Sequence, residues 1–264
     1  MEDYIVVKYQ VDDILKTFTD AQKIRTGFMR RIAQTLTETT GNAFILKGGT
    51  ALLLAYGLPR YSTDLDYDGR DRNIDIARYL QTSAERTGIQ IDSLNLKKDT
   101  ESVKRYMLHY KGSENDPLKV EISYRQAITI NDKDITIIDG ICVYVIEKLA
   151  SLKAAAFLGR MKARDVFDIA FILRQYPDAI QKDLLIRISE RVDELTLDLL
   201  SAAMREERIL RGFDPDEIVL DLQNRIDRLK TKPSILNQME EYKKDILNNH
   251  PKKKNSDKKF EPEL

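Results

Sequence analysis

The chain has 264 residues, a length typical of one large domain or two small ones. Its 43 basic and 43 acidic side chains leave no formal net charge, which argues against a protein held on nucleic acid or a membrane by bulk charge. Apolar residues make up 42% of the chain, enough for a hydrophobic core.

Cysteine and histidine usage excludes two classes of site. The one cysteine, Cys142, rules out an internal disulfide and a cysteine-rich zinc site, and it fits a reducing compartment. His109 and His250 lie far apart in the sequence, which argues against a histidine metal centre. The start of the chain is acidic and the apolar runs are far shorter than the ~20 residues of a membrane span. We therefore expect a cytoplasmic protein with no membrane partner.

The first half of the chain alternates between helical and strand patterns. Apolar residues at steps of three and four predict an amphipathic helix over 20–40, capped by Thr19 or Asp20. The spacing of apolar residues and the positions of turn-forming residues then predict a strand over 43–46, a core helix over 50–56, a strand over 62–68 and a helix over 72–87. Further strands are expected over 90–96, 103–110, 118–124, 127–130, 135–138 and 141–145.

The second half has helical spacing from Glu147 to Asn248. We therefore expect an α/β domain over 1–145 and a helical domain over 146–250. The end of the chain, 251–264, has five lysines against three acidic residues and is expected to be a disordered basic tail. Such a tail either keeps the protein in solution or makes a weak contact with a polyanion.

Two acidic residues, Asp64 and Asp66, alternate with Leu65 in the strand predicted over 62–68. Alternation places both carboxylates on one face, ~7 Å apart, and points Leu65 into the core. Like charges this close repel unless a cation lies between them, and Mg²⁺ prefers carboxylate and phosphate oxygens. The pattern fits Mg²⁺ carrying a triphosphate, although it also occurs at exposed acidic strand ends. Asp68 continues the same face but precedes Gly69, so we expect it to be a turn residue.

A glycine pair, Gly48 and Gly49, lies between a predicted strand and the start of a helix, followed by Thr50. Free N–H groups and the helix dipole favour phosphate at such a position, and Thr50 adds a hydroxyl. The spacing of a Walker loop is absent, and a glycine pair alone would indicate only a turn. Arg60 and Ser62 follow closely, and the order of these residues before the two aspartates makes the combination more specific.

Glu121 is the acidic residue inside the strand predicted over 118–124. Alternation places Lys119, Glu121 and Ser123 on one face and apolar residues on the other. Glu121 is either a general base or second metal ligand, or a solvent-facing residue paired with Lys119.

A second group of charged residues comprises Lys153, Arg160, Arg164 and Asp168. On one continuous helix these side chains would fall within about 80° of each other. The face is either a phosphate clamp in which Asp168 orients a basic partner, or a solvated face with an ordinary Arg164–Asp168 pair. If Gly159 breaks the helix, the residues before and after it need not share a face.

Four segments of the sequence resemble the AbiEii/AbiGii nucleotidyltransferase toxin family, the MenT-like toxins of type IV toxin–antitoxin and abortive-infection systems. The matching segments are 46–52, 60–66, 119–122 and 153–169. The resemblance implies an α+β fold: a polymerase-β-type nucleotidyltransferase domain with a mixed sheet, followed by a C-terminal helical domain. It also implies that a nucleoside monophosphate is transferred from an NTP to an acceptor hydroxyl, for which the tRNA 3′ end is our first expectation. A cognate antitoxin is the expected protein partner.

The same resemblance implies roles for the residues identified above. Asp64 and Asp66 would hold Mg²⁺, with Glu121 as third carboxylate and base. The phosphate cradle would comprise Gly48, Gly49 and Thr50. Lys153 would contact the triphosphate, and Asp168 would complete the catalytic set. The supporting positions would be Arg60, Ser62, Arg160 and Arg164. Two alternatives remain: the same fold could modify a protein or a small molecule, or the chain could be an inactive module that binds a nucleotide or an antitoxin.

Overall fold

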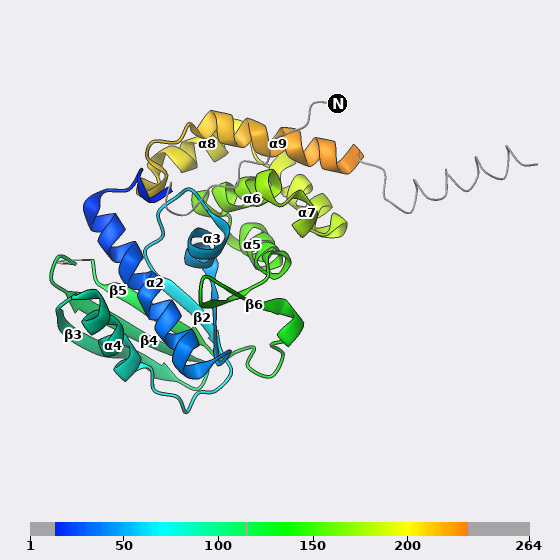
Figure 1. Cartoon of the computed structure of the whole chain (residues 1–264). Helices are drawn as coiled ribbons and strands as arrows, with labels where there is room; N and C mark the ends of the chain where they lie inside the picture. Colours follow the sequence, from blue (N-terminus) through cyan, green and yellow to red (C-terminus); the bar gives the residue numbers. More distant parts are fainter. Residues whose placement is uncertain (1–13, 114–115, 232–264) are drawn as a thin grey trace, which may run out of the picture.

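The computed structural model describes residues 14–113 and 116–231. It has a mixed α+β architecture, in which a seven-stranded sheet is followed by a set of helices (Figure 1). The fold class expected from the sequence is confirmed. The predicted tail over 251–264 and the end of the predicted helical domain, 232–250, lie outside the described residues.

The sheet and its helices lie between Asp20 and Tyr144 of the described residues. The helices are α2 (Asp20–Thr40), α3 (Gly48–Tyr56) and α4 (Ala77–Thr87), with a short 3₁₀ turn η1 (Asp132–Asp134). The strands are β1 (Phe44–Lys47), β2 (Leu65–Gly69), β3 (Ile91–Thr100), β4 (Val103–Tyr110), β5 (Leu118–Ser123), β6 (Ile135–Ile138) and β7 (Ile141–Tyr144).

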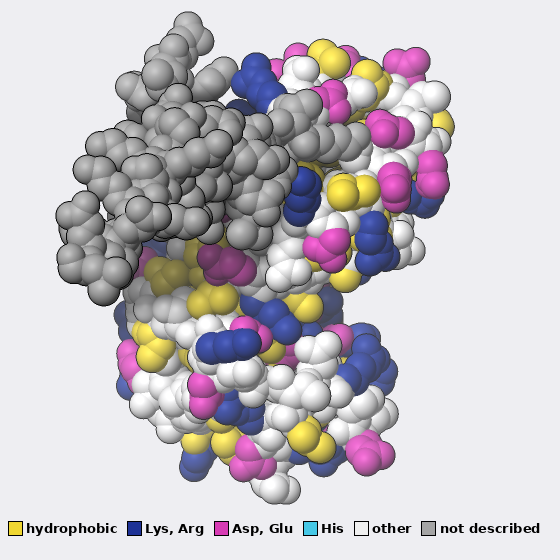
Figure 2. Space-filling model, turned by 90° about the vertical axis from the view of Figure 1, so that its right-hand side faces the viewer, with side chains coloured by type: hydrophobic (Ala, Val, Ile, Leu, Met, Phe, Trp, Pro, Cys, Tyr) yellow, Lys and Arg dark blue, Asp and Glu magenta, His cyan; other side chains and the backbone are white. Residues whose placement is uncertain are grey.

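The remaining described residues are helical. The helices are α5 (Ile146–Arg160), α6 (Ala163–Gln175), α7 (Lys182–Asp193), α8 (Leu197–Glu206) and α9 (Pro215–Thr231), with 3₁₀ turns η2 (Pro177–Ala179) and η3 (Arg208–Leu210). In Figure 1 they lie above the sheet, and Figure 2 shows the surface hollowed between this helical part and the sheet part below it.

Helix α2 forms where its capping residues and apolar period predict it. The Thr19 side chain accepts a hydrogen bond from the Gln22 backbone, and the Gln22 side chain returns one to Thr19, so the helix begins with a capping box. Phe28, Met29 and Ile32 on its apolar face are fully buried, whereas Ile24, one turn before Phe28, is exposed. Together with α4, this helix covers one face of the sheet (Figure 1).

The strand order is β3-β4-β5-β2-β1-β7-β6. Strand β2 lies between β1, with which it runs antiparallel, and β5, with which it runs parallel. The register sets Asp66 beside Lys47 on one side and Glu121 on the other. Residues more than fifty positions apart in the sequence therefore meet on one face of the sheet.

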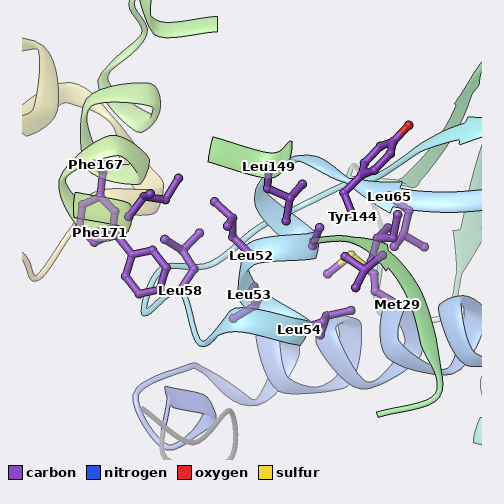
Figure 3. Packing of buried hydrophobic residues seen from close by; sticks show 14 of the residues in the cluster. Met29, Leu52, Leu53, Leu54, Leu58, Leu65, Tyr144, Leu149, Phe167 and Phe171 are labelled. Carbon is purple, nitrogen blue, oxygen red and sulfur yellow. The ribbon is translucent and has the colours of Figure 1, made fainter. Parts of the chain in front are cut away.

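Helix α3 is apolar on most of its surface because it is packed on several sides. Figure 3 shows it between Phe167 and Phe171 of α6 on one side and Leu65 and Tyr144 of the sheet on the other. At its end, the Tyr56 hydroxyl donates to the Tyr144 carbonyl at 2.8 Å. The α3 helix therefore joins the sheet to the helical part through one hydrophobic core.

Several predicted boundaries differ from the structure. The strand predicted over 62–68 begins only at Leu65, and the helix predicted over 72–87 begins at Ala77. Residues 127–130, predicted as a strand, form turns in which Ile128 is fully exposed, so that prediction is wrong. The short apolar run there has no neighbouring strand to pair with.

Two further expectations are corrected by packing. Asp68 is not a turn residue: it lies inside β2 and is buried. Residues 153–168 do not form one helix, because α5 ends at Arg160 and Met161 adopts a left-handed conformation with φ of 41°. Gly159 does not cause this break, since it lies within α5. Within the described residues, no helix is long and apolar enough to cross a membrane.

Candidate active site

Asp64 and Asp66 lie at the start of β2, and both point to the side chain of Lys119 on β5. The Lys119 Nζ atom is 2.9 Å from Asp64 Oδ2 and 3.8 Å from Asp66 Oδ1. Leu65, between them, is fully buried, as alternation predicts. The two carboxylates therefore share one face and a single cation.

Glu121 is next to Asp66 in the parallel register of β2 and β5. Its carboxylate accepts a hydrogen bond from Arg105 Nε on β4 at 2.7 Å, so its ion-pair partner is Arg105 and not Lys119. The apolar side chains Val120 and Ile122 are buried on the opposite face, as expected. Glu121 thus belongs to the acidic face but is held toward the neighbouring strand.

The close packing of these charges is reflected in their pKa values. Burial raises the pKa of Asp66 above its ordinary value; Lys119 opposes this, while the charges of Asp64 and Glu121 add to it. Burial by itself would lower the pKa of Lys119, but its hydrogen bond to Asp64 and the acidic charges around it raise that pKa overall. The acidic face therefore favours a cation held among its carboxylates.

The turn of Gly48 and Gly49 opens helix α3 directly beside Asp66. Gly48 has φ of 80°, which favours glycine, and a Cβ there would lie 3.3 Å from Asp66 Oδ2. The N-cap residue Lys47 makes no side-chain cap hydrogen bond. The first N–H groups of α3 are thus free of a side-chain cap, and such groups favour phosphate.

Thr50 and Ser62 hold the segment that leads into β2. The Thr50 side chain is buried, its Oγ1 lies 2.8 Å from Ser62 Oγ, and it donates to the carbonyl of Asp64. Its hydroxyl therefore positions Asp64 from behind the glycine turn. The phosphate contact expected for this hydroxyl stays a prediction.

Asp168 on α6 is fully buried and binds two cations. It accepts hydrogen bonds from Arg60 Nε at 2.6 Å and Arg60 Nη2 at 2.7 Å, and its Oδ2 lies 2.5 Å from Lys153 Nζ on α5. Burial by itself would raise the pKa of Asp168, but Arg60 and Lys153 hold it below its ordinary value. Asp168 therefore pairs with Lys153 and with a second cation, Arg60, and its role as an orienting group stays a prediction.

Arg160 lies two turns after Lys153 in the same helix, α5, so these two side chains share a face as expected, whereas Arg164 and Asp168 belong to α6, beyond the turn at Met161. Arg160 is half-exposed and pairs with the buried Asp165 at 3.0 Å. Asp66 and Asp168 also contribute to raising the pKa of Arg160, after the larger effect of Asp165, which places this guanidinium within electrostatic range of both. Among the described residues, Asp168 pairs with Arg60 and Lys153 and not with Arg164, whose buried Nε has no hydrogen-bond partner there.

Asp68 is a buried polar group that continues the acidic face and that the sequence pattern did not identify as buried. Asp68 accepts a hydrogen bond from Lys47 Nζ at 2.5 Å and from the Tyr144 hydroxyl at 2.9 Å. Because it is buried and fully engaged, Asp68 ties β2 to β1 and β7. The alternation with Asp64 and Asp66 was visible in the sequence, but the partners come from two other strands.

The fit of a divalent cation rests on the donor set. Asp64 and Asp66 both reach one ammonium group, so their oxygens converge on a position where a cation is already stabilised. Carboxylate oxygens suit Mg²⁺, which is often bound by only one or two of them. Within the described residues, no group of three or more His, Cys, Asp or Glu side chains converges as a metal site, since Glu121 is drawn to Arg105. The pair fits the ion, with Glu121 beside it.

Acidic and basic groups meet at the glycine turn. Asp66 lies against Gly48, while a Cβ on Gly49 would lie 2.8 Å from Arg60 Nη2. Arg60 in turn binds Asp168, which binds Lys153. A cation-binding carboxylate pair and a cationic group therefore flank one helix N-terminus, an arrangement that can bind a metal–polyphosphate.

The profile of the family described as "Nucleotidyl transferase AbiEii toxin, Type IV TA system" matches residues 32–261 of the chain. This range contains every site residue discussed above. Among curated proteins, none matches the chain.

Solved structures share the fold. JHP933 from Helicobacter pylori is 28% identical with a TM-score of 0.71, covering 88% of this chain and 100% of its own. A Helicobacter pylori protein described as a nucleotidyltransferase is 32% identical with a TM-score of 0.71, covering 81% of this chain and 96% of its own. MenT4, a nucleotidyltransferase toxin from Mycobacterium tuberculosis, is a more distant match: it is 15% identical with a TM-score of 0.45, covering 91% of this chain and 97% of its own.

The buried Asp168 gives a prediction for stability. Asp168→Asn leaves Arg60 and Lys153 buried without their counter-charge, and we expect it to lower the free energy of unfolding by about 3–5 kcal/mol. Urea denaturation of the full chain measures this. Glu38→Gln, which breaks the exposed pair with Arg86, is the control and should cost about 1 kcal/mol at most. Equal effects of the two substitutions would contradict the buried ion triad.

The same group predicts how stability depends on pH. Since the folded pKa of Asp168 is depressed, its contribution is present above the ordinary Asp pKa of about 4 and is lost as pH falls through the lower folded value. The difference in the free energy of unfolding between the wild type and Asp168→Asn should therefore shrink as the pH falls from the ordinary Asp pKa of about 4 toward the lower folded pKa. Urea midpoints at neutral and acidic pH test it, and a difference that stays constant would argue against the assignment.

The close approach of Gly49 to Arg60 predicts the effect of a methyl group. In Gly49→Ala the new Cβ would lie 2.8 Å from Arg60 Nη2 and 3.1 Å from Ser62 Oγ, so Arg60 must shift on Asp168. We expect a loss of about 1–3 kcal/mol in thermal or urea unfolding. Gly27→Ala is the matched control, because nothing lies within 4 Å of its Cβ and alanine favours the helix interior. If Gly49→Ala is as stable as Gly27→Ala, the turn can accommodate a Cβ atom and the prediction is wrong.

Proposed function

The chain belongs to the AbiEii family of nucleotidyl transferase toxins of type IV toxin–antitoxin systems, and we propose that it is an Mg²⁺-dependent enzyme that transfers a nucleoside monophosphate from an NTP to the 3′ end of tRNA. The observation that carries the proposal is the glycine turn. It has the carboxylates of Asp64 and Asp66 on one side and the cations Arg60 and Lys153 on the other.

The cationic side is suited to the triphosphate. Lys153 is fixed by Asp168 through one contact of an ammonium that has three donors, which leaves donors for a phosphate. Arg60 donates to Asp168 through two nitrogens, and this bidentate pair holds its guanidinium in one orientation beside Gly49. Phosphoryl transfer requires mainly alignment and neutralisation of charge, and these residues supply both.

The acidic side is suited to the metal and to the acceptor. Mg²⁺ bound by Asp64 and Asp66 would neutralise phosphate charge and polarise the phosphorus that is attacked. Glu121, half-buried next to Asp66, is the group we assign to accept the proton of the acceptor hydroxyl. Arg105, its partner, holds Glu121 in a fixed orientation through a hydrogen bond from Nε.

The wider assignments follow from family membership. A toxin of this type is expected to act with a cognate antitoxin, and the acceptor is an RNA end in our proposal. A chain with no net charge can bind RNA through local cations, and Arg160 beside the site is one of them. We retain the division into a nucleotidyltransferase domain over 1–145 and a helical domain over 146–250 as part of this proposal, although Lys153 and Asp168 come from the second.

Labelled nucleotides test the proposal directly. Purified full-length protein is incubated with each α-labelled NTP, Mg²⁺ and total tRNA, and we expect label on the tRNA 3′ end. Asp66→Asn removes a metal ligand without changing the shape of the side chain, and it should reduce labelling about a hundredfold or more. Glu190→Gln, an exposed substitution on α7, is the control that should keep full activity.

The outcomes separate the competing functions. Unchanged labelling by Asp66→Asn would remove the metal site. Label on protein or on a small molecule in a lysate would keep the enzyme and change the acceptor. NTP binding without pyrophosphate release, with any acceptor, would identify a binding module. Induced expression of wild type and Lys153→Ala, followed by sequencing of RNA ends, links the reaction to growth arrest.

A further inference from the structure

Lys119 lies where a metal ion would lie. Its ammonium is 2.9 Å from Asp64 and 3.8 Å from Asp66, and among the described residues it is the cation within ion-pair distance of either carboxylate. The sequence and the family resemblance gave it no role beyond a neighbour of Glu121.

The position of Lys119 is imposed by the sheet. Asp66 pairs with Glu121 in the parallel register of β2 and β5, so the residue two positions earlier on β5, Lys119, lies beside Asp64. Alternation points all these side chains to the same face. A flexible side chain is thus anchored at a fixed point, from which its ammonium reaches both carboxylates.

The other acidic side chains on this face have their own cations. Glu121 is bound by Arg105, and Asp68 is bound by Lys47. Lys119 is therefore the group that neutralises the Asp64–Asp66 pair. It remains partly accessible, with 28% of its side chain exposed, whereas Lys153 at the buried triad has 9%. Exposure allows Lys119 to leave its partners at moderate cost.

We propose that Lys119 is an exchangeable counter-ion: it holds Asp64 and Asp66 together when no metal is bound, and a divalent cation must displace it to bind them. The inference rests on the proposed metal site and adds a positioning residue that sets how tightly the site binds metal. An ammonium and a divalent cation cannot occupy the same place between two carboxylates, so the two compete.

Removing the ammonium should have opposite effects in the absence and presence of metal. In Lys119→Met without metal, two partly buried carboxylates repel each other, and the melting temperature should fall below that of the wild type. With Mn²⁺ the repulsion is relieved and no ammonium has to leave. The rise in melting temperature on adding Mn²⁺ should therefore exceed that of the wild type.

The experiment measures Mn²⁺ binding by the full chain. Free Mn²⁺ is followed by electron paramagnetic resonance, and melting temperatures are recorded in a chelator and in Mn²⁺ without nucleotide. We expect Lys119→Met to bind Mn²⁺ about fivefold more tightly than the wild type or better. Lys97→Met removes an exposed lysine of β3 and should match the wild type. Lys119→Gln, a milder change, should shift both readouts in the same direction as Lys119→Met if that variant folds poorly.

Each outcome decides the inference. If the wild type binds Mn²⁺ and both Lys119 variants bind it no more tightly, Lys119 is a structural ion-pair partner only, and the inference fails while the metal site stands. If no protein binds Mn²⁺, the metal site of the proposed function fails together with the inference. The double variant Lys119→Met/Asp64→Asn should be stable in chelator, because one of the repelling charges is gone, and should lose the gain in Mn²⁺ affinity. Retention of the gain would overturn the competition at Asp64.

Discussion

The ion triad of Asp168, Arg60 and Lys153 is the constraint that fixes the site. Its three members come from α6, the segment after α3, and α5, and all are buried. A buried charge that loses its partner costs several kcal/mol, so these three segments can pack only with their charges in contact. The division predicted at residue 145 therefore runs through the site: the helical part supplies Lys153 and Asp168, while the sheet part supplies the glycine turn.

A neutral chain can build a strongly charged site because opposite charges are separated over a short distance. Gly48 and Gly49 mark the boundary: Asp66 packs against the first, and Arg60 packs against the second. Side chains larger than hydrogen would force these groups apart. The two glycines thus allow the carboxylate pair and the cationic group to meet at one helix N-terminus, which is the arrangement that the proposed binding of a metal–nucleotide requires.

Local patterns were sufficient to predict some of these features. Alternation around Leu65 placed Asp64 and Asp66 on one face, and the glycine pair marked the start of α3. The partners of these residues were not predictable, because they depend on strand order. Lys119 binds the aspartates, and Arg105 binds Glu121, only because β5 lies between β2 and β4. The helical phase predicted from Lys153 holds as far as Arg160 and fails for Arg164 and Asp168, because Met161 adopts a left-handed conformation that the sequence does not signal.

Burial divides the ion pairs of the site into permanent and exchangeable ones. The Asp168 side chain has no exposed surface, and both of its oxygens are bound by cations. Asp168 therefore fixes the positions of Arg60 and Lys153 and keeps these partners. Asp66 and Arg105 each keep 40% of the side chain exposed, and water can replace their partners. A site with the proposed function, which admits a cation and a polyphosphate, needs both kinds. The permanent pairs preserve its geometry. The more exposed pairs neutralise carboxylates that would otherwise repel each other, which is the reason an acidic face this crowded can fold.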